Sequence, residues 1–213
     1  MGETAIAPST AKVNTAQYIP EELIYEVAHG RPIYYRGYRE VLNGNSTLEA
    51  IMADSSLQSW LKAQITILLG SYYLGKGIEL ATGELGLLLG DGDKRGADIA
   101  FYRSGDLLLN AHYTQTPPEA IIEIDTQIDL KDENEMEYVL EKLDDYLHFG
   151  VKKVVWIFTR NRKVMIAMPD SPWLTVGWAS DVEMLDGASF NLEKMLEGKR
   201  ARSVLKSNRA IVR

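Results

Sequence analysis

The sequence predicts an α/β fold in which a mixed β-sheet is flanked by helices. Two long segments carry apolar residues at three- and four-residue steps, which is the spacing of an amphipathic helix. Short runs rich in β-branched and aromatic residues lie before, between and after them, and such runs are typical of strands. The predicted order of elements along the chain is therefore strands, helix, strands, helix and strands, which is typical of an α/β sandwich.

Length and composition indicate one ordinary domain. The chain has 213 residues, of which 46% are hydrophobic and 25% charged, so it can form a substantial core. We expect the domain to span residues 18–198, with a flexible tail at 1–17 and a basic tail at 199–213. Residues 1–17 lack the basic and apolar blocks of a signal peptide, and no apolar run is long enough to cross a bilayer. We therefore expect no membrane partner.

Charge and the absence of cysteine limit the kinds of site. Without cysteine, disulfides and thiolate metal sites are excluded, which fits a reducing cytoplasm. The three histidines are scattered, so a hard cation on carboxylates is favoured over zinc. The net charge of -7 argues against broad coating of nucleic acid, because phosphate binding requires local positive charge. The basic residues of 199–213 form either an unstructured end or an arm that contacts phosphates.

The first half of the chain contains a hairpin, a helix and a further strand. Residues 24–35 predict two short strands joined by a turn at Gly30, where glycine adopts a positive φ at little cost. Residues 57–74 predict the first long helix, whose polar face carries no carboxylate. Residues 78–89 predict a strand interrupted by glycines, and 90–96 predict a turn-rich loop. The apolar face of the helix is formed by Leu57, Leu61, Ile65, Leu68 and Leu69.

The second half begins with two apolar strands, at 97–102 and 120–125, separated by an irregular stretch. The second long helix is predicted at 129–149 and ends at Gly150. Its apolar face holds Met136, Val139, Leu140, Leu143 and Leu147. Beyond it, we expect strands at 154–158, 164–168 and 173–178, and a short helix at 190–196 capped by Asn191.

Three residues of this framework supply the groups that metal-dependent phosphodiester cleavage requires. Such cleavage needs a divalent metal to activate water, carboxylates to hold the metal, and a cation near the attacking or leaving oxygen. Asp98 and Glu123 each lie on one of the two apolar strands, whose separation permits them to be neighbours. Lys142 lies on the second long helix, which can fold back over the sheet. These three residues are the catalytic candidates, and Asp98 and Glu123 are the metal-ligand candidates.

A purely structural explanation fits the same residues. Burying the unpaired carboxylate of Glu123 costs several kcal/mol, so it needs a metal or a cation beside it. Lys142 lies at the margin of its helix's apolar face, where a long side chain can bury its stem and direct its amine toward the sheet. An ion pair between Glu123 and Lys142, without metal, would satisfy both. Asp125 is either an additional metal ligand or the polar end of its strand.

At these positions the sequence resembles the Uma2 (DUF820) family of restriction-endonuclease-like proteins, which are abundant in cyanobacteria and other bacteria and belong to the PD-(D/E)xK nuclease superfamily. The family pattern is a strand Pro-Asp-Val/Ile, a strand Glu-Val-x, and Lys-x-x-x-Tyr-x-x-x-Gly-Val before an apolar strand with Trp. The corresponding residues are Ala97-Asp98-Ile99, Glu123-Ile124-Asp125, and Lys142, Tyr146, Gly150 and Val151, followed by Trp156. Residues 25–30 also resemble the family's N-terminal hairpin, and the similarity spans most of 20–168.

The resemblance implies a restriction-endonuclease-like core with a Mg²⁺ or Mn²⁺ site. Asp98 and Glu123 would be ligands, together with the backbone carbonyl of Ile124, and Lys142 would be the catalytic lysine. The motif also marks Tyr146 as a substrate-binding candidate. The usual place of the lysine, two residues after the acid, holds Asp125 here, which adds negative charge beside the metal.

The sequence therefore favours a metal-dependent endonuclease that acts on DNA as a homodimer, with RNA as an alternative substrate. Dimerisation is inferred by analogy and because cutting both strands of a duplex requires two sites. The rival interpretation is a catalytically inactive nucleic-acid-binding or regulatory protein on the same fold. The net acidity favours this rival, as does the absence from the first helix of a glutamate that the superfamily often has; Glu49 and Glu84 are the available substitutes.

Overall fold

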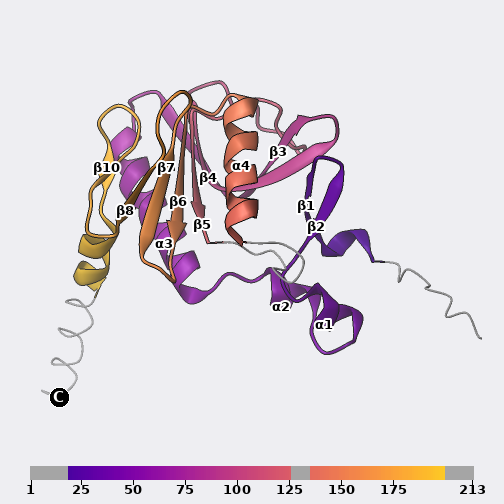
Figure 1. Cartoon of the computed structure of the whole chain (residues 1–213). Helices are drawn as coiled ribbons and strands as arrows, with labels where there is room; N and C mark the ends of the chain where they lie inside the picture. The colour runs from indigo at the N-terminus through magenta and orange to yellow at the C-terminus, as the bar shows by residue number, and fades with distance from the viewer. Residues whose placement is uncertain (1–18, 126–134, 200–213) are drawn as a thin grey trace, which may run out of the picture.

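A mixed β-sheet forms the centre of the computed structural model, which describes residues 19–125 and 135–199 (Figure 1). Within these ranges the sheet has eight strands. They are β1 (Ile24–Ala28), β2 (Arg31–Tyr34), β3 (Ile78–Gly90), β4 (Asp93–Arg103), β5 (Ala120–Ile124), β6 (Lys153–Phe158), β7 (Lys163–Ala167) and β8 (Leu174–Gly177). Their order is β2-β1-β4-β5-β6-β7-β8, and β3 pairs with β4 outside this path. β5 and β6 are parallel, whereas the other pairs are antiparallel.

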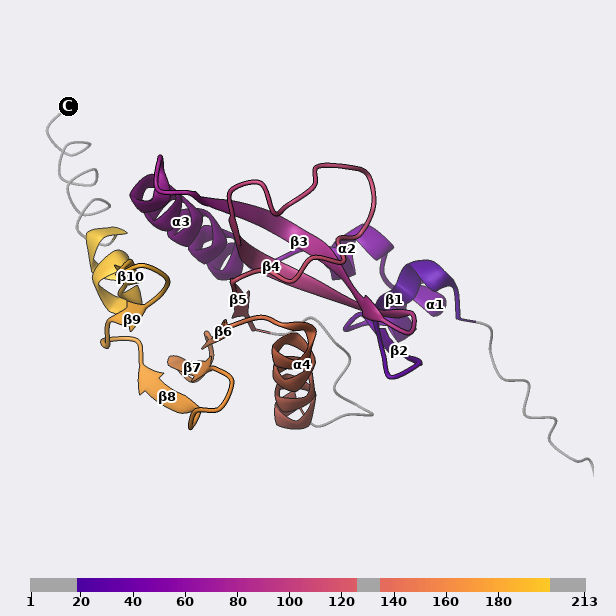
Figure 2. The same cartoon turned by 90° about the horizontal axis from the view of Figure 1, so that it is seen from above.

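Helices lie on both faces of the sheet, as the view from above shows (Figure 2). The helical elements are a 3-10 turn (Glu21–Leu23), α1 (Tyr38–Leu42), α2 (Leu48–Met52), α3 (Ser56–Tyr73), α4 (Glu135–Phe149) and residues 192–199. A small second sheet pairs β9 (Val182–Glu183) with β10 (Ser189–Phe190). The predicted α/β fold, a mixed sheet flanked by helices, is thus confirmed.

Helix α3 forms where its local sequence and its apolar spacing agree. The Ser55 hydroxyl accepts a hydrogen bond from the Gln58 backbone N–H at 3.2 Å, and the Gln58 side chain accepts one from the Ser55 N–H at 3.1 Å. This capping box satisfies two backbone donors at the start of the helix. The buried face of α3 packs in one core with strand residues of the sheet; the members include Leu61, Ile65, Leu69, Ile99, Ile122 and Ile124.

Helix α4 covers the opposite face of the sheet. Val139 and Leu143 belong to a second core that contains Ile121 of β5 and Trp156 of β6. Ile122 and Ile124 of β5 belong to the core under α3, whereas Ile121 belongs to the core under α4. Because side chains alternate along a strand, Glu123 lies on the same face as Ile121. The strand β5 therefore directs the carboxylate of Glu123, between two residues of the α3 core, toward α4.

The prediction of a loop at 90–96 is wrong, because most of this segment belongs to a hairpin. β3 ends at Gly90 and β4 begins at Asp93, so only two residues, Asp91 and Gly92, form the turn. Both have positive φ, as two-residue hairpin turns of the favoured type require. The carboxylate of Asp93 also accepts hydrogen bonds from the backbone N–H groups of His29 and Gly30, which fixes the start of β4 against the first hairpin.

The remaining differences concern the ends of elements. The helix predicted at 129–149 is described from Glu135 onward, and 129–134 lie outside the described residues. Residues 1–17 and 200–213 of the predicted tails also lie outside them. Phe190 belongs to β10 and not to the last helix, but Asn191 is the predicted cap: its side-chain oxygen accepts a hydrogen bond from the Lys194 N–H at 3.0 Å. No helix within the described ranges is both long and apolar enough to span a membrane.

Candidate active site

Asp98 lies at an irregular point of the long β3–β4 hairpin. The pairing register shifts between Thr82 and Leu85, directly opposite Asp98. The side chain is only 4% exposed, and its Oδ2 accepts a hydrogen bond from the backbone N–H of Ile124 on β5 at 2.7 Å. Burial raises the pKa of Asp98 well above its usual value, and the nearby carboxylates of Glu123 and Glu84 add to the effect. The carboxylate is therefore held against the end of β5, where an added cation would stabilise its charged form.

Lys62 of α3 was not among the candidates from sequence, yet its ammonium contacts Asp98 directly. Nζ lies 2.6 Å from Asp98 Oδ1, 2.8 Å from Asp54 Oδ2 and 3.1 Å from Glu84 Oε1. Although partial burial disfavours the charge of Lys62, the surrounding carboxylates raise its pKa. Three carboxylates thus share one ammonium, which α3 supplies.

Glu123 lies on β5 with its carboxylate on the α4 side. It is 3% exposed, and its Oε1 lies 2.5 Å from the Tyr146 hydroxyl and 3.3 Å from Lys142 Nζ. Burial raises the pKa of Glu123 to about 7, although Lys142 and Tyr146 act in the opposite direction. The predicted neighbourhood of Asp98, Glu123 and Lys142 is therefore present: Asp98 bonds to the residue after Glu123, and Lys142 contacts Glu123 itself.

Lys142 is more deeply enclosed than expected for a lysine that meets a substrate. It is 1% exposed, and its ammonium lies 2.8 Å from Glu26 Oε1. Aromatic rings surround the ammonium, with centroids at 5.6 to 5.8 Å; they belong to Tyr25, Tyr138, Tyr146 and Trp156. In this structure Lys142 therefore neutralises two buried acids, Glu26 and Glu123, inside a largely apolar shell.

Glu26 of β1 is a second buried acid that the sequence analysis missed. Its Oε1 contacts Lys142 Nζ and accepts a hydrogen bond from the Gly96 backbone N–H at 2.9 Å. Its Oε2 accepts hydrogen bonds from Arg95 at 3.0 Å and from the Tyr138 hydroxyl at 2.7 Å. Although burial opposes ionisation, Lys142 and Arg95 hold the pKa of Glu26 below its usual value. With four donors on two oxygens, Glu26 is a charged anchor for Lys142.

Tyr146 and Gln58 complete the surroundings of the two candidate ligands. The hydroxyl of Tyr146 lies between Glu123 Oε1 and the Gly96 carbonyl oxygen, 2.6 Å away, and the residue is fully buried. The side-chain amide of Gln58 donates a hydrogen bond to the Ile124 carbonyl at 3.1 Å. This carbonyl keeps a second lone pair, so it can also serve a metal.

Asp125, the third candidate metal ligand, lies just past the end of β5. Its φ of 58° turns the chain out of the strand. Its two carboxylate oxygens accept hydrogen bonds from Thr159, at 2.7 Å from the backbone N–H and 2.5 Å from the hydroxyl. This arrangement is that of a polar strand end.

A second group of potential metal ligands includes two residues of α4, Glu141 and Asp145, which directly precede Lys142 and Tyr146 in the sequence. One ligand atom each of His29, Glu141 and Asp145 lies within 4.8 Å of the others. The buried Arg95, however, contacts both Glu141 and Asp145, so these carboxylates already have a cation. We interpret this group as the outer part of the Arg95 ion-pair network.

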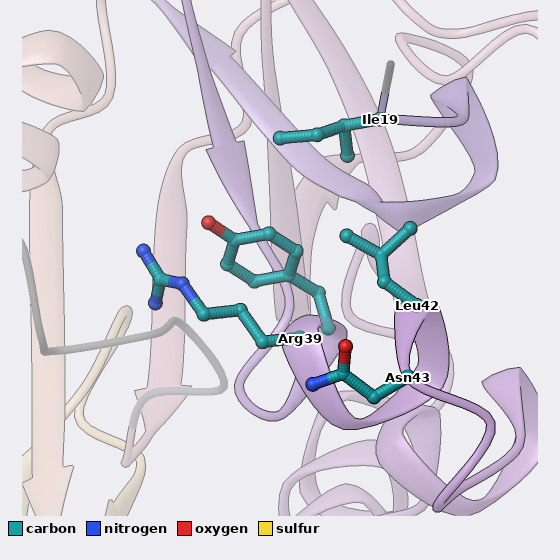
Figure 3. Close-up of a pocket in the computed structure, with 5 residues that line it drawn as sticks. Ile19, Arg39, Leu42 and Asn43 are labelled. Atoms are coloured by element: carbon teal, nitrogen blue, oxygen red, sulfur yellow. The ribbon is translucent and has the colours of Figure 1, made fainter. Parts of the chain in front are cut away.

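The cavity near α1 shares no residue with the acids. It measures about 170 Å³ and is lined by Ile19, Tyr38, Arg39, Leu42 and Asn43 (Figure 3). The Arg39 guanidinium lies over the ring of Tyr38, 4.6 Å from its centroid. This cavity holds no carboxylate and gives no reason to move the candidate site away from Asp98 and Glu123.

The donor atoms around Asp98 and Glu123 fit a hard divalent cation. All of these atoms are oxygens: they belong to the two carboxylates, the Ile124 carbonyl and the carboxylate of Glu84. Mg²⁺ and Mn²⁺ prefer oxygen ligands over nitrogen or sulfur. The ammonium of Lys62 contacts three carboxylates here, so these acids already attract a cation. Both Asp98 and Glu123 have raised pKa values, so each gains from additional positive charge.

Known proteins share this chain's sequence pattern and fold. The model of the Uma2 family, described as "Putative restriction endonuclease", matches residues 40–193. A crystal structure from Anabaena variabilis ATCC 29413, titled as "a putative nuclease belonging to DUF820", aligns with a TM-score of 0.58 and 12% identity, covering 79% of this chain and 87% of that one. It supports the restriction-endonuclease-like fold. No curated protein matches. Because the family match covers more than half of its length, the chain belongs to the Uma2 family.

Proposed function

We propose that this protein is a nuclease that hydrolyses phosphodiester bonds in DNA with Mg²⁺ or Mn²⁺ as cofactor. The observation that carries the proposal is the pair of buried carboxylates, Asp98 and Glu123, joined through the end of β5 by the hydrogen bond from Ile124 to Asp98. Two buried acids so placed cost free energy unless positive charge is supplied. Membership in Uma2 supports the nuclease class.

In the proposed site, Asp98, Glu123 and the Ile124 carbonyl would hold the metal through oxygen atoms. The bound metal would lower the pKa of a coordinated water and offset charge on the phosphate. Lys142 and Tyr146 fix the orientation of the Glu123 carboxylate. We therefore assign Lys142, predicted as the catalytic lysine, the part of a positioning residue. Asp125 is left out of the ligand set because it lies past the end of β5, where Thr159 holds its carboxylate. Tyr146 is left out of substrate binding because it is buried.

Duplex DNA as the substrate leads to a proposal about assembly. One such site can cut one strand, so we propose that two copies of the domain, residues 18–198, act together as a homodimer. A dimer converts supercoiled plasmid directly to the linear form, whereas a single site produces nicked circles first.

Removal of divalent metal is expected to stop cleavage. With Mg²⁺ or Mn²⁺, supercoiled plasmid should be converted to linear product, and EDTA should reduce conversion to the level of a no-protein control, because hydrolysis then lacks its activated water. Excess Mg²⁺ should restore it. A labelled RNA and a labelled DNA of the same sequence, assayed side by side, identify the preferred substrate. Cleavage that persists in EDTA would contradict metal dependence, and cleavage of RNA alone would contradict the DNA assignment.

One structural feature favours the second candidate, an inactive regulatory or nucleic-acid-binding protein. Glu26, Lys142 and Glu123 form a closed, buried set of charges that needs no metal. If the protein retards labelled DNA on a gel, yet neither binds Mn²⁺ nor cleaves any nucleic acid tested, this second function replaces the first.

A further inference from the structure

The site contains two lysines, which differ in access to solvent. Lys142 is 1% exposed and lies within a shell of aromatic rings. The side chain of Lys62 is 12% exposed, and its partner Glu84 is 39% exposed. A nucleic-acid phosphate must reach the carboxylates from solvent, so it meets the Lys62 side of the site first. Of these two ammonium groups, only that of Lys62 can reach such a phosphate without opening the core.

The contacts of Lys62 overlap with those expected of a metal. Its ammonium lies on Asp98 Oδ1 at 2.6 Å and on Glu84 Oε1 at 3.1 Å. A divalent cation that bound Asp98 would lie close to this ammonium, and two cations at such separation repel strongly in a poorly solvated site. Full occupancy by both on the same oxygens is therefore disfavoured.

A second acid, Asp54, can hold the ammonium of Lys62 when this ammonium leaves Asp98. Asp54, just before the start of α3, lies 2.8 Å from the same ammonium. The four-carbon stem of a lysine carries its charge on a flexible arm. Lys62 can therefore keep Asp54 as a partner while it leaves Asp98 and turns toward the open side.

We propose that Lys62 is an exchangeable cation: it neutralises Asp98 and Glu84 in the metal-free protein, and a divalent metal displaces it toward the substrate phosphate. This inference rests on the proposed function and deepens it, because it names the lysine that meets the phosphate. It also gives the otherwise acidic site a way to remain charge-balanced before the metal arrives. Lys142 keeps its separate part as the buried partner of Glu26 and Glu123.

Metal binding without nucleic acid tests the exchange. In calorimetric titrations of the full chain with Mn²⁺, Lys62→Met should bind at least about tenfold more tightly than the wild type, because a competing charge is removed. Lys62→Arg keeps the charge and should stay close to the wild type. Lys76→Met is the matched control, since Lys76 lies just beyond the opposite end of α3 with its ammonium over the ring of Tyr72. The double variant Lys62→Met, Asp98→Asn should lose the gained affinity.

Binding of DNA tests the contact with phosphate. With Ca²⁺ in place of Mg²⁺ and a short labelled duplex, Lys62→Met should bind about tenfold more weakly. The slope of log affinity against log salt concentration should also fall by about one, as for a lost phosphate contact. Lys76→Met should leave both quantities unchanged.

The outcomes separate this inference from the proposed function. If the wild type binds Mn²⁺ and Lys62→Met binds it equally or more weakly, the exchange is wrong and the nuclease proposal stands. Unchanged DNA affinity and salt slope in Lys62→Met would overturn the phosphate contact. If Lys62→Met binds Mn²⁺ and the wild type does not, the exchange is supported in its strongest form. If no variant binds Mn²⁺, both proposals fail.

Discussion

Replacing Asp98 by Asn is expected to reduce DNA cleavage by on the order of a hundredfold or more, because the site loses a negatively charged metal ligand. The variant should remain folded. An amide oxygen can still accept the hydrogen bond that Ile124 donates to Asp98, and Lys62 retains Asp54 and Glu84 as partners. The measurement is the initial rate of plasmid conversion with Mg²⁺, alongside thermal unfolding of both proteins.

Two companion variants make this prediction specific. Glu123→Gln should lose cleavage to a similar extent, because it also removes a charged ligand while its side chain can still accept the Tyr146 hydrogen bond. Asp125→Asn is the matched control. Asp125 lies two residues after Glu123, and Thr159 holds its carboxylate, so cleavage by this variant should stay within about threefold of wild type. If Asp98→Asn cleaves as fast as Asp125→Asn, Asp98 is not a ligand and the proposed site is wrong.

Replacing Lys142 by Met is expected to destabilise the protein by about 3–5 kcal/mol, since it leaves buried charges without their partner. Glu123 would lose the only ammonium that contacts it among the described residues, while Glu26 would keep Arg95. Methionine fills a similar volume, so the loss of stability reflects the missing charge more than a change in packing. Urea unfolding followed by circular dichroism measures the change in the free energy of unfolding.

A surface lysine gives the reference for that measurement. Lys152→Met breaks an exposed ion pair with Glu119 and should change the free energy of unfolding by less than about 1 kcal/mol. Lys142→Met should also lose cleavage at temperatures where it is folded, because Glu123 is no longer oriented. A Lys142 variant that is as stable as Lys152→Met and cleaves normally would show that Lys142 neither supports the core nor positions Glu123.

The fold, and the proximity of Asp98, Glu123 and Lys142, could be predicted because both leave a local signal in the sequence. A carboxylate inside an apolar strand, as at Asp98 and Glu123, must find a cation when the strand is buried. A lysine at the margin of an apolar helix face, as at Lys142, has the reach to provide one. The same reasoning could have found Glu26, which also lies within a short apolar strand.

The residues that sequence reasoning missed owe their role to contacts between distant elements. Lys62 lies on the polar face of α3, where a lysine is ordinarily solvated, and becomes partly buried because the β3–β4 hairpin brings Glu84 and Asp98 beside it. Arg95 seemed to belong to a surface loop, yet β4 buries it between β1 and α4. No periodicity within one segment encodes these pairings.

Asp125 shows how a backbone angle changes a prediction made from alternation. Continuing β5 by one residue would place Asp125 on the same face as Glu123. The positive φ of Asp125 ends the strand at Ile124, and Thr159 then captures the carboxylate. Asp and Asn adopt this conformation more readily than most residues, but a single sequence does not show where they will do so.

Calorimetric titration with Mn²⁺ of the wild type and Asp98→Asn tests the central claim most directly, because it requires no knowledge of the natural DNA sequence. The account predicts saturable binding by the wild type that is lost in Asp98→Asn and retained in Asp125→Asn. Equal binding by wild type and Asp98→Asn would contradict the assignment of Asp98 and Glu123 as the metal site.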